Sequence, residues 1–235
     1  DADSIDWAAS LRSGRLYRRT YQEEKAVPTY VVCDFSASLL SQENLAQNLR
    51  KTAGLLCRCA EINQDPLGII FFTDEIELFL KAEPGARQLK KILSNLQNFT
   101  PKNRGTNIKR LLTETANVLK QKSQIFLLSD LLTEDFKKEL QFFCSRHELF
   151  VCHFTADYFA DFKHNLWLKI NNPEDISRSS LHNLCKSSEL QQRQKEHFSK
   201  LQEDLQSCKT AYVQLAANQD SCSILLNYFR SRIGK

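Results

Sequence analysis

Apolar runs alternate with longer stretches of helical periodicity through the middle of the sequence. Residues 30–33 (Tyr-Val-Val-Cys) are apolar without polar alternation, which predicts a strand buried on both faces of a sheet. Further strands are predicted at 67–73, 76–80, 125–128 and 149–154, and helices at 41–63, 85–98, 107–121 and 133–147. This alternation favours an α/β fold with a doubly wound, mostly parallel sheet between two layers of helices.

The pattern is less regular beyond residue 155. We expect an edge strand at 166–170, a helix at 188–206, a short strand at 212–215 and a closing helix at 221–233. No linker-like composition separates this part, so residues 29–235 are predicted to form one domain with a C-terminal helical and edge-strand extension. Residues 1–28 are predicted to be a lead-in that packs on the domain.

Composition and charge narrow the class of protein. With 235 residues, of which 42% are hydrophobic and 26% charged, the sequence is that of an ordinary globular protein with a large core. The net charge of +4 is too small to indicate nucleic-acid binding by itself. Four arginines between Arg12 and Arg19 are interpreted as a solvated face; a nucleic-acid patch is the alternative, but no recognised binding motif supports it.

The eight cysteines do not resemble a disulfide framework. Cys33 lies in the first strand, and Cys57, Cys144 and Cys152 lie in apolar or periodic segments. Buried free thiols indicate a reducing compartment, so we expect a cytoplasmic domain. No apolar run reaches the roughly 20 residues that span a bilayer. The sequence begins at Asp1 and contains no Met, so we expect a fragment or a processed form.

Candidate chemistry lies where the predicted strands end. Asp34, Ser36 and Ser38 follow the first strand, Thr106 opens a helix after Gly105, and Asp130 ends a later strand. In an open α/β sheet, ligands bind beyond the carboxyl ends of the strands at the point where strand order reverses. Several oxygen ligands at such an edge suit a hard cation, with Mg²⁺ as the first choice.

These residues resemble the metal-ion-dependent adhesion site of von Willebrand factor A (VWA) domains, which have a three-layer, Rossmann-like fold. More narrowly, residues 4–7 (Ser-Ile-Asp-Trp), 21–24 (Tyr-Gln-Glu-Glu) and 225–232 resemble segments of the bacterial domain-of-unknown-function family 58. The sequence departs from that family's pattern at three positions: Asp3, Leu39 and Arg104 replace a usual Arg, Met and Gly. None of these changes removes a ligand oxygen, but Arg104 brings a cation close to the crevice.

The resemblance implies a role for each of the five residues. Ser36 and Ser38 would bind Mg²⁺ directly, with Mn²⁺ or Ca²⁺ as substitutes, and Thr106 would bind directly or through water. Asp34 and Asp130 would act mainly through bound waters and by orienting the serines. An open position would remain for an Asp or Glu of a partner, which the resemblance suggests is a MoxR-type AAA+ ATPase or its client. No catalytic residue is implied.

Other interpretations stay open at this point. Asp and Ser also favour turns for local reasons, and Thr106 could simply cap a helix. An enzyme would use Asp34 as a phosphoryl acceptor beside Mg²⁺ in phosphoryl transfer or hydrolysis, which needs further positioned charge. No phosphate-binding Gly-x-x-x-x-Gly-Lys-Ser/Thr motif occurs. Cys144 and His147 are three residues apart on a predicted helix, where we expect a buried Cys and a solvated His.

Overall fold

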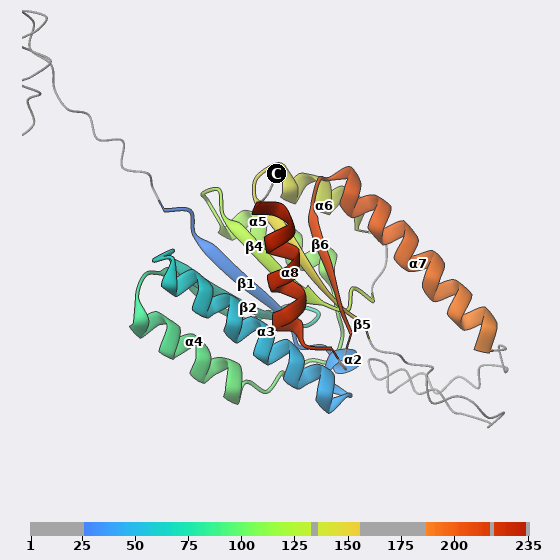
Figure 1. Cartoon of the computed structure of the whole chain (residues 1–235), viewed down its shortest axis with the longest axis horizontal. Coiled ribbons are helices and arrows are strands. Elements are labelled where there is room, and N and C mark those ends of the chain that lie inside the picture. The colour runs from blue at the N-terminus through green and yellow to red at the C-terminus, as the bar shows by residue number, and fades with distance from the viewer. Residues whose placement is uncertain (1–25, 133–135, 156–186, 217–218, 234–235) are drawn as a thin grey trace, which may run out of the picture.

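The chain folds around one six-stranded sheet. The computed structural model describes residues 26–132, 136–155, 187–216 and 219–233 (Figure 1). The strands are β1 (Thr29–Asp34), β2 (Leu67–Phe72), β3 (Ile76–Glu83), β4 (Gln124–Ser129), β5 (Glu148–Thr155) and β6 (Ala211–Ala216). Their order is β3-β2-β1-β4-β5-β6, and only the edge strand β3 runs antiparallel to its neighbour. The predicted α/β class with a mostly parallel sheet is confirmed.

Helices cover both faces of this sheet (Figure 1). They are α2 (Ala37–Leu40), α3 (Glu43–Ile62), α4 (Ala86–Asn98), α5 (Ile108–Val118), α6 (Lys137–Cys144), α7 (Ser187–Ser207) and α8 (Ser221–Ile233). One apolar core lies between the sheet and α3, α4 and α8, and a second lies between the sheet and α5, α6 and α7. Side chains of β1 alternate between them: Val31 and Cys33 enter the first, Tyr30 and Val32 the second. Burial on both faces explains why this strand carries a continuous apolar run.

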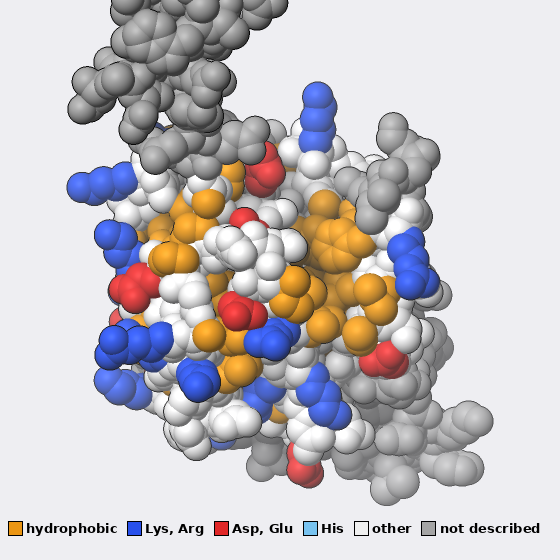
Figure 2. All heavy atoms as spheres, turned by 60° about the vertical axis from the view of Figure 1, so that its left-hand side comes forward, with side chains coloured by type: hydrophobic (Ala, Val, Ile, Leu, Met, Phe, Trp, Pro, Cys, Tyr) orange, Lys and Arg blue, Asp and Glu red, His pale blue; other side chains and the backbone are white. Residues whose placement is uncertain are grey.

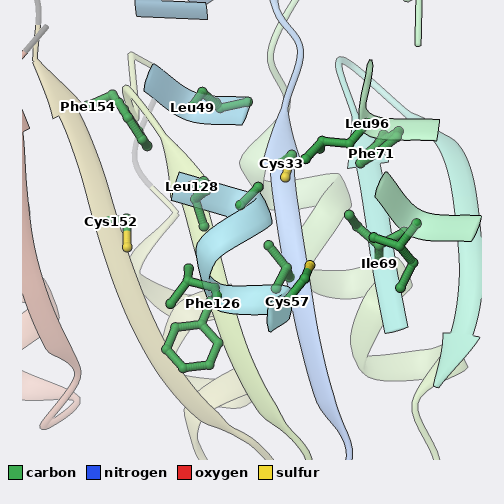
Figure 3. Close-up of a cluster of buried hydrophobic side chains, with 14 of the residues drawn as sticks. Cys33, Leu49, Cys57, Ile69, Phe71, Leu96, Phe126, Leu128, Cys152 and Phe154 are labelled. Atoms are coloured by element: carbon green, nitrogen blue, oxygen red, sulfur yellow. The ribbon is translucent and has the colours of Figure 1, made fainter. Parts of the chain in front are cut away.

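Buried cysteines are part of the first core. Cys33, Cys57 and Cys152 lie among leucine, isoleucine and phenylalanine side chains (Figure 3). Burial raises the pKa of all three thiols, that of Cys57 to about 12, so they stay protonated and act as small apolar groups. Within the described ranges every cysteine is free, and Cys59 is exposed, so it faces away from Cys57 as its spacing predicts.

Most predicted elements match those observed, with two differences near the candidate residues. The predicted helix 41–63 corresponds to α3 (Glu43–Ile62), and a separate one-turn helix, α2, precedes it. The predicted helix 133–147 is shorter in the structure, where it is α6 (Lys137–Cys144). His147 therefore lies beyond the helix, where its ring packs against Phe143 at a centroid distance of 5.0 Å. The expectation of a buried Cys144 and a solvated His147 was wrong: His147 is buried and Cys144 only half-buried.

The C-terminal part extends the sheet rather than forming a separate unit. The predicted helix 188–206, strand 212–215 and helix 221–233 correspond to α7, β6 and α8, and β6 pairs in parallel with β5. The predicted lead-in up to residue 25, its arginine cluster and the predicted strand 166–170 lie outside the described residues. Among the helices that are described, none is long and apolar enough to cross a membrane.

Some apolar side chains remain at the surface. Figure 2 shows them on one face of the molecule, interspersed with Lys and Arg side chains. The most exposed large ones in the described chain include Ile62 at the end of α3 and Leu226 and Phe229 on α8. Scattered apolar side chains are normal on protein surfaces and do not define a binding site by themselves.

Candidate metal-binding site

The candidate site consists of Asp34, Ser36, Ser38, Thr106 and Asp130, at the carboxyl-end edge of the parallel strands. Strands β1 and β4 are direct neighbours, with Cys33 aligned with Leu128. Strand order reverses here, because the chain continues from β1 to β2 on one side and reaches β4 on the other. The expected adjacency of the first strand and the Asp130-bearing strand is therefore confirmed.

Asp34 is the buried centre of this edge. Its side chain is fully buried, and both carboxylate oxygens accept hydrogen bonds. The backbone N–H of Ser36 donates to Oδ1 at 2.9 Å, and the hydroxyl of Ser129 donates to Oδ2 at 2.5 Å. The first bond shapes the loop after β1, and the second joins that loop to β4.

Two serine hydroxyls lie side by side in the segment that follows Asp34. The Oγ atoms of Ser36 and Ser38 are 3.1 Å apart, and both residues are buried. Phe35 holds the start of this loop in place. The centroid of its ring lies 4.8 Å from the ring centroids of Phe71 and Phe99. The loop therefore holds two neutral hydroxyl oxygens next to each other.

Thr106 lies on residues 99–107, the segment between α4 and α5. The backbone N–H of Ala37 donates to the carbonyl oxygen of Arg104 at 2.9 Å, which ties this segment to the loop that carries the serines. Asn107, and not Thr106, caps α5: its side-chain oxygen accepts from the N–H of Arg110 at 2.9 Å. The capping alternative for Thr106 is thus contradicted by the structure.

Glu77 on β3 holds the same segment from the other side. Its carboxylate accepts from the N–H of Lys102 at 2.7 Å, the N–H of Asn103 at 3.0 Å and the hydroxyl of Thr73 at 2.8 Å. Although burial favours the neutral acid, these donors lower the pKa of Glu77 overall, so the carboxylate is charged at neutral pH.

Asp130 follows β4 and is 1% exposed. Its Oδ1 accepts from the N–H of Leu132 at 3.3 Å, and its backbone oxygen lies 3.0 Å from Nε2 of His153. Nδ1 of His153 is 2.6 Å from the hydroxyl of Tyr212 on β6. Burial lowers the pKa of His153 to about 4, so the ring is neutral and acts as a support for the strand end.

Electrostatics distinguish the two carboxylates from ordinary turn residues. Burial raises the pKa of Asp34 to about 8, and repulsion from Asp130 acts in the same direction, against the hydrogen bonds from Ser129 and Ser36. Two buried, mutually repelling carboxylates are costly unless a proton or a cation offsets their charge.

The donor set fits a hard cation. The described residues contain no group of three or more His, Cys, Asp or Glu side chains that could hold a metal, so nitrogen and sulfur ligands do not gather there as a soft transition metal requires. The candidate site instead offers the carboxyl groups of Asp34 and Asp130 and the hydroxyls of Ser36 and Ser38, with Thr106 on the adjoining segment, and oxygen ligands are those that Mg²⁺ prefers. An ion placed here would also offset the repulsion between Asp34 and Asp130.

Sequence reasoning missed the residues that support the site. Ser129, Glu77, His153 and Tyr212 make the contacts described above, yet only Ser129 adjoins a predicted ligand. In the sequence, the one signal for such a supporting residue is the hydroxyl of Ser129, directly before Asp130 at the end of a predicted strand. Glu77 and His153 contact the site from distant parts of the sequence, Tyr212 contacts His153, and none of the three carries a local pattern.

Solved structures with the same fold define the class of protein. BatB from Bacteroides thetaiotaomicron superposes with a TM-score of 0.58 at 13% identity, covering 89% of this chain and 100% of BatB. The SpRpn10 VWA domain gives a TM-score of 0.54 at 13% identity, covering 88% of this chain and 95% of that one. An aerotolerance-related membrane protein from Bacteroides fragilis gives 0.54 at 14% identity, with 87% and 99% covered. The chain therefore has a VWA-like fold.

The family follows from the sequence itself. Residues 1–160 match the family described as protein of unknown function DUF58, and the chain belongs to that family. The match covers more than half of the sequence and agrees with the resemblance seen in its motifs. No curated protein matches the chain significantly.

Proposed function

We propose that this chain is a non-enzymatic protein-interaction domain that docks an acidic residue of a partner protein through Mg²⁺ held at the candidate site. One observation carries the proposal: the paired hydroxyls of Ser36 and Ser38 adjoin a buried carboxylate pair, in which burial and mutual repulsion raise the pKa of Asp34 to about 8. The negative charge of such a buried pair is uncompensated without a cation and compensated when a cation is bound.

The contacts suggest a division of labour within the candidate site. Ser36 and Ser38 would hold the ion directly, and Thr106 directly or through water. Asp34 already accepts two hydrogen bonds, which suits a residue that orients the serines and holds bound waters. When bound, Mg²⁺ (or Mn²⁺ or Ca²⁺ in its place) would supply an electrophilic point for a partner carboxylate, because neutral direct ligands leave most of its charge uncompensated.

We propose a MoxR-type AAA+ ATPase or a client of that ATPase as the partner, because the sequence motifs resemble those of the DUF58 family, to which the chain belongs. An ATP-driven partner works where ATP is supplied, so we place this domain in the cytoplasm.

An enzyme that uses Asp34 as a phosphoryl acceptor is the alternative to docking. Such a nucleophile must present a carboxylate oxygen to its substrate. Asp34 is fully buried, and both of its oxygens accept hydrogen bonds. The geometry therefore favours docking over nucleophilic chemistry at this residue.

A pull-down of the MoxR-type ATPase from the source organism tests the proposal. Wild type and the double variant Ser36→Ala/Ser38→Ala are compared in Mg²⁺ and in EDTA. Ser145→Ala is a matched control, because Ser145 is exposed and its hydroxyl bonds only to the end of α6 at the Phe142 carbonyl. We expect capture only with Mg²⁺ and both serines. Equal capture under all conditions would reject a metal bridge.

A further inference from the structure

Arg104 is an exposed residue whose backbone is held beside the candidate site. Its carbonyl oxygen accepts from the N–H of Ala37, the residue between Ser36 and Ser38, and it lies two positions before Thr106. The backbone next to the proposed ligands therefore carries a long side chain with a permanent positive charge.

The neighbouring acidic groups already have partners. Glu77 accepts from Lys102 and Asn103, and Glu75 interacts with the side chains of Asn103 and Arg110. The carboxylate of Asp74 interacts electrostatically with Arg110, whose guanidinium also donates to the backbone carbonyl oxygen of Asp74. Within the described part of the chain, the guanidinium of Arg104 forms no ion pair or hydrogen bond.

An exposed guanidinium beside a cation site requires more than one negative charge from a partner. A divalent ion at the candidate site would repel Arg104, and one carboxylate on the ion would not compensate both charges. A planar guanidinium also pairs with a carboxylate through two parallel hydrogen bonds, which gives it directional preference as well as charge.

We infer that Arg104 is a second anion-binding point, so that the partner segment presents two nearby carboxylates, one to the bound cation and one to Arg104. The inference rests on the proposed function and specifies its ligand as an acidic pair. In an extended segment, side chains two positions apart face the same side, so an Asp-x-Asp arrangement fits this requirement.

Three synthetic Gly/Ser-based peptides test the inference by titration calorimetry in Mg²⁺ and in EDTA. One carries a single Asp, one carries Asp-Gly-Asp, and the third carries two Asp residues at opposite ends. The last two have the same composition and net charge, so they differ only in spacing. We expect wild type in Mg²⁺ to bind the Asp-Gly-Asp peptide about two- to fivefold more tightly than its isomer, the range expected for an exposed ion pair.

Variants at two exposed cations identify the residue responsible. Arg104→Gln should bind the two isomers equally while still binding the single-Asp peptide in Mg²⁺. Arg104→Lys should keep only part of the preference, because it keeps the charge but loses the planar donor pair. Lys109→Gln is the matched control: it removes one exposed positive charge from the first turn of α5 and should keep the full preference.

The outcomes separate this inference from the proposed function. Equal affinity of wild type for the two isomers, or a preference that survives Arg104→Gln, would overturn the inference alone if binding still requires Mg²⁺. Peptide binding that is indifferent to EDTA and to Ser36→Ala/Ser38→Ala would overturn both, as would the absence of binding by all three peptides. Thermal unfolding of each variant confirms that the fold is retained.

Discussion

Asp34 and Asp130 lie at the ends of two adjacent strands and are buried, whereas Thr106 lies on a partly exposed segment between two helices. The contacts that hold the strand half (Asp34, Ser129 and Asp130) come from the sheet and its backing histidine. Those that hold the loop half (residues 99–107) come from Glu77 and Glu75 and from the backbones of Ala37 and Thr73. Changes in the strand half should therefore affect stability and metal binding together, and changes in the loop half mainly metal binding.

The largest effect is expected for Asp34→Ala. This substitution leaves the hydroxyl of Ser129 and the N–H of Ser36 buried without their acceptor. We expect the free energy of unfolding to fall by roughly 2–4 kcal/mol, measured by urea denaturation in EDTA, because each unsatisfied buried donor costs about 1–3 kcal/mol. Stabilisation by Mg²⁺ should disappear as well. A loss below about 0.5 kcal/mol, the usual range for surface changes, would show that the strand half is not the rigid part of the site.

A smaller effect, with a defined pH dependence, is expected for Asp34→Asn. In the metal-free wild type, Asp34 has a pKa of about 8 when folded and an ordinary value near 3.8 when unfolded. Between these values the folded state holds a proton that the unfolded chain has released, so stability falls as pH rises towards 8. Asn cannot titrate, so the variant should lack this component while keeping an acceptor in place of the carboxylate.

Urea denaturation in EDTA from pH 6.5 to 8.5 measures this component as the difference between wild type and Asp34→Asn. The window avoids His153, whose low folded pKa makes stability fall only as pH drops below the ordinary histidine value of about 6.5. We expect wild type to lose about 1–2 kcal/mol relative to the variant across the window. Saturating Mg²⁺ should remove the difference in slope by binding the deprotonated pair. Parallel pH profiles in EDTA would contradict the raised pKa.

The arrangement of the strand half could largely be predicted from sequence, whereas for the loop half only the position of Thr106 before a helix could be predicted and its supporting contacts could not. The apolar run before Asp34 and the apolar run before Asp130 each identify a strand end, and the usual order of a doubly wound sheet makes those ends neighbours. The Ser129 contact spans 95 residues in sequence, so its existence depends on that strand order rather than on a local pattern.

The support of Thr106 illustrates what local patterns leave out. Glu77 contacts the N–H of Asn103 across 26 residues, and its position on the edge strand β3 looks in sequence like any polar residue of a half-exposed strand. His147 gave a wrong prediction for a related reason. The helix ends at Cys144, and His147, expected to be solvated, lies beyond that end, where it is buried with its ring against Phe143.

The smallest change in stability, and the clearest test of the loop half, is expected for Glu77→Gln. Gln keeps one carbonyl oxygen but loses the charge that attracts the N–H groups of Lys102 and Asn103, and water can reach the exposed N–H groups that it releases. We expect the free energy of unfolding to fall by less than about 1 kcal/mol, because the cost of a lost bond is small where solvent replaces it.

Metal affinity should respond more strongly to Glu77→Gln than stability does. The segment that carries Thr106 would lose its Glu77 anchor, and we expect Mg²⁺ to bind about three- to tenfold more weakly, because a hydrogen bond typically contributes about 0.5–1.5 kcal/mol. Glu114→Gln is the matched control, since it removes one negative charge by breaking an exposed ion pair with Arg110 and leaves the Glu77 contacts intact. Calorimetric titration with Mg²⁺ decides the matter: equal affinities for the two variants would mean that the other contacts of the segment position Thr106 without Glu77, or that Thr106 contributes nothing to holding the ion.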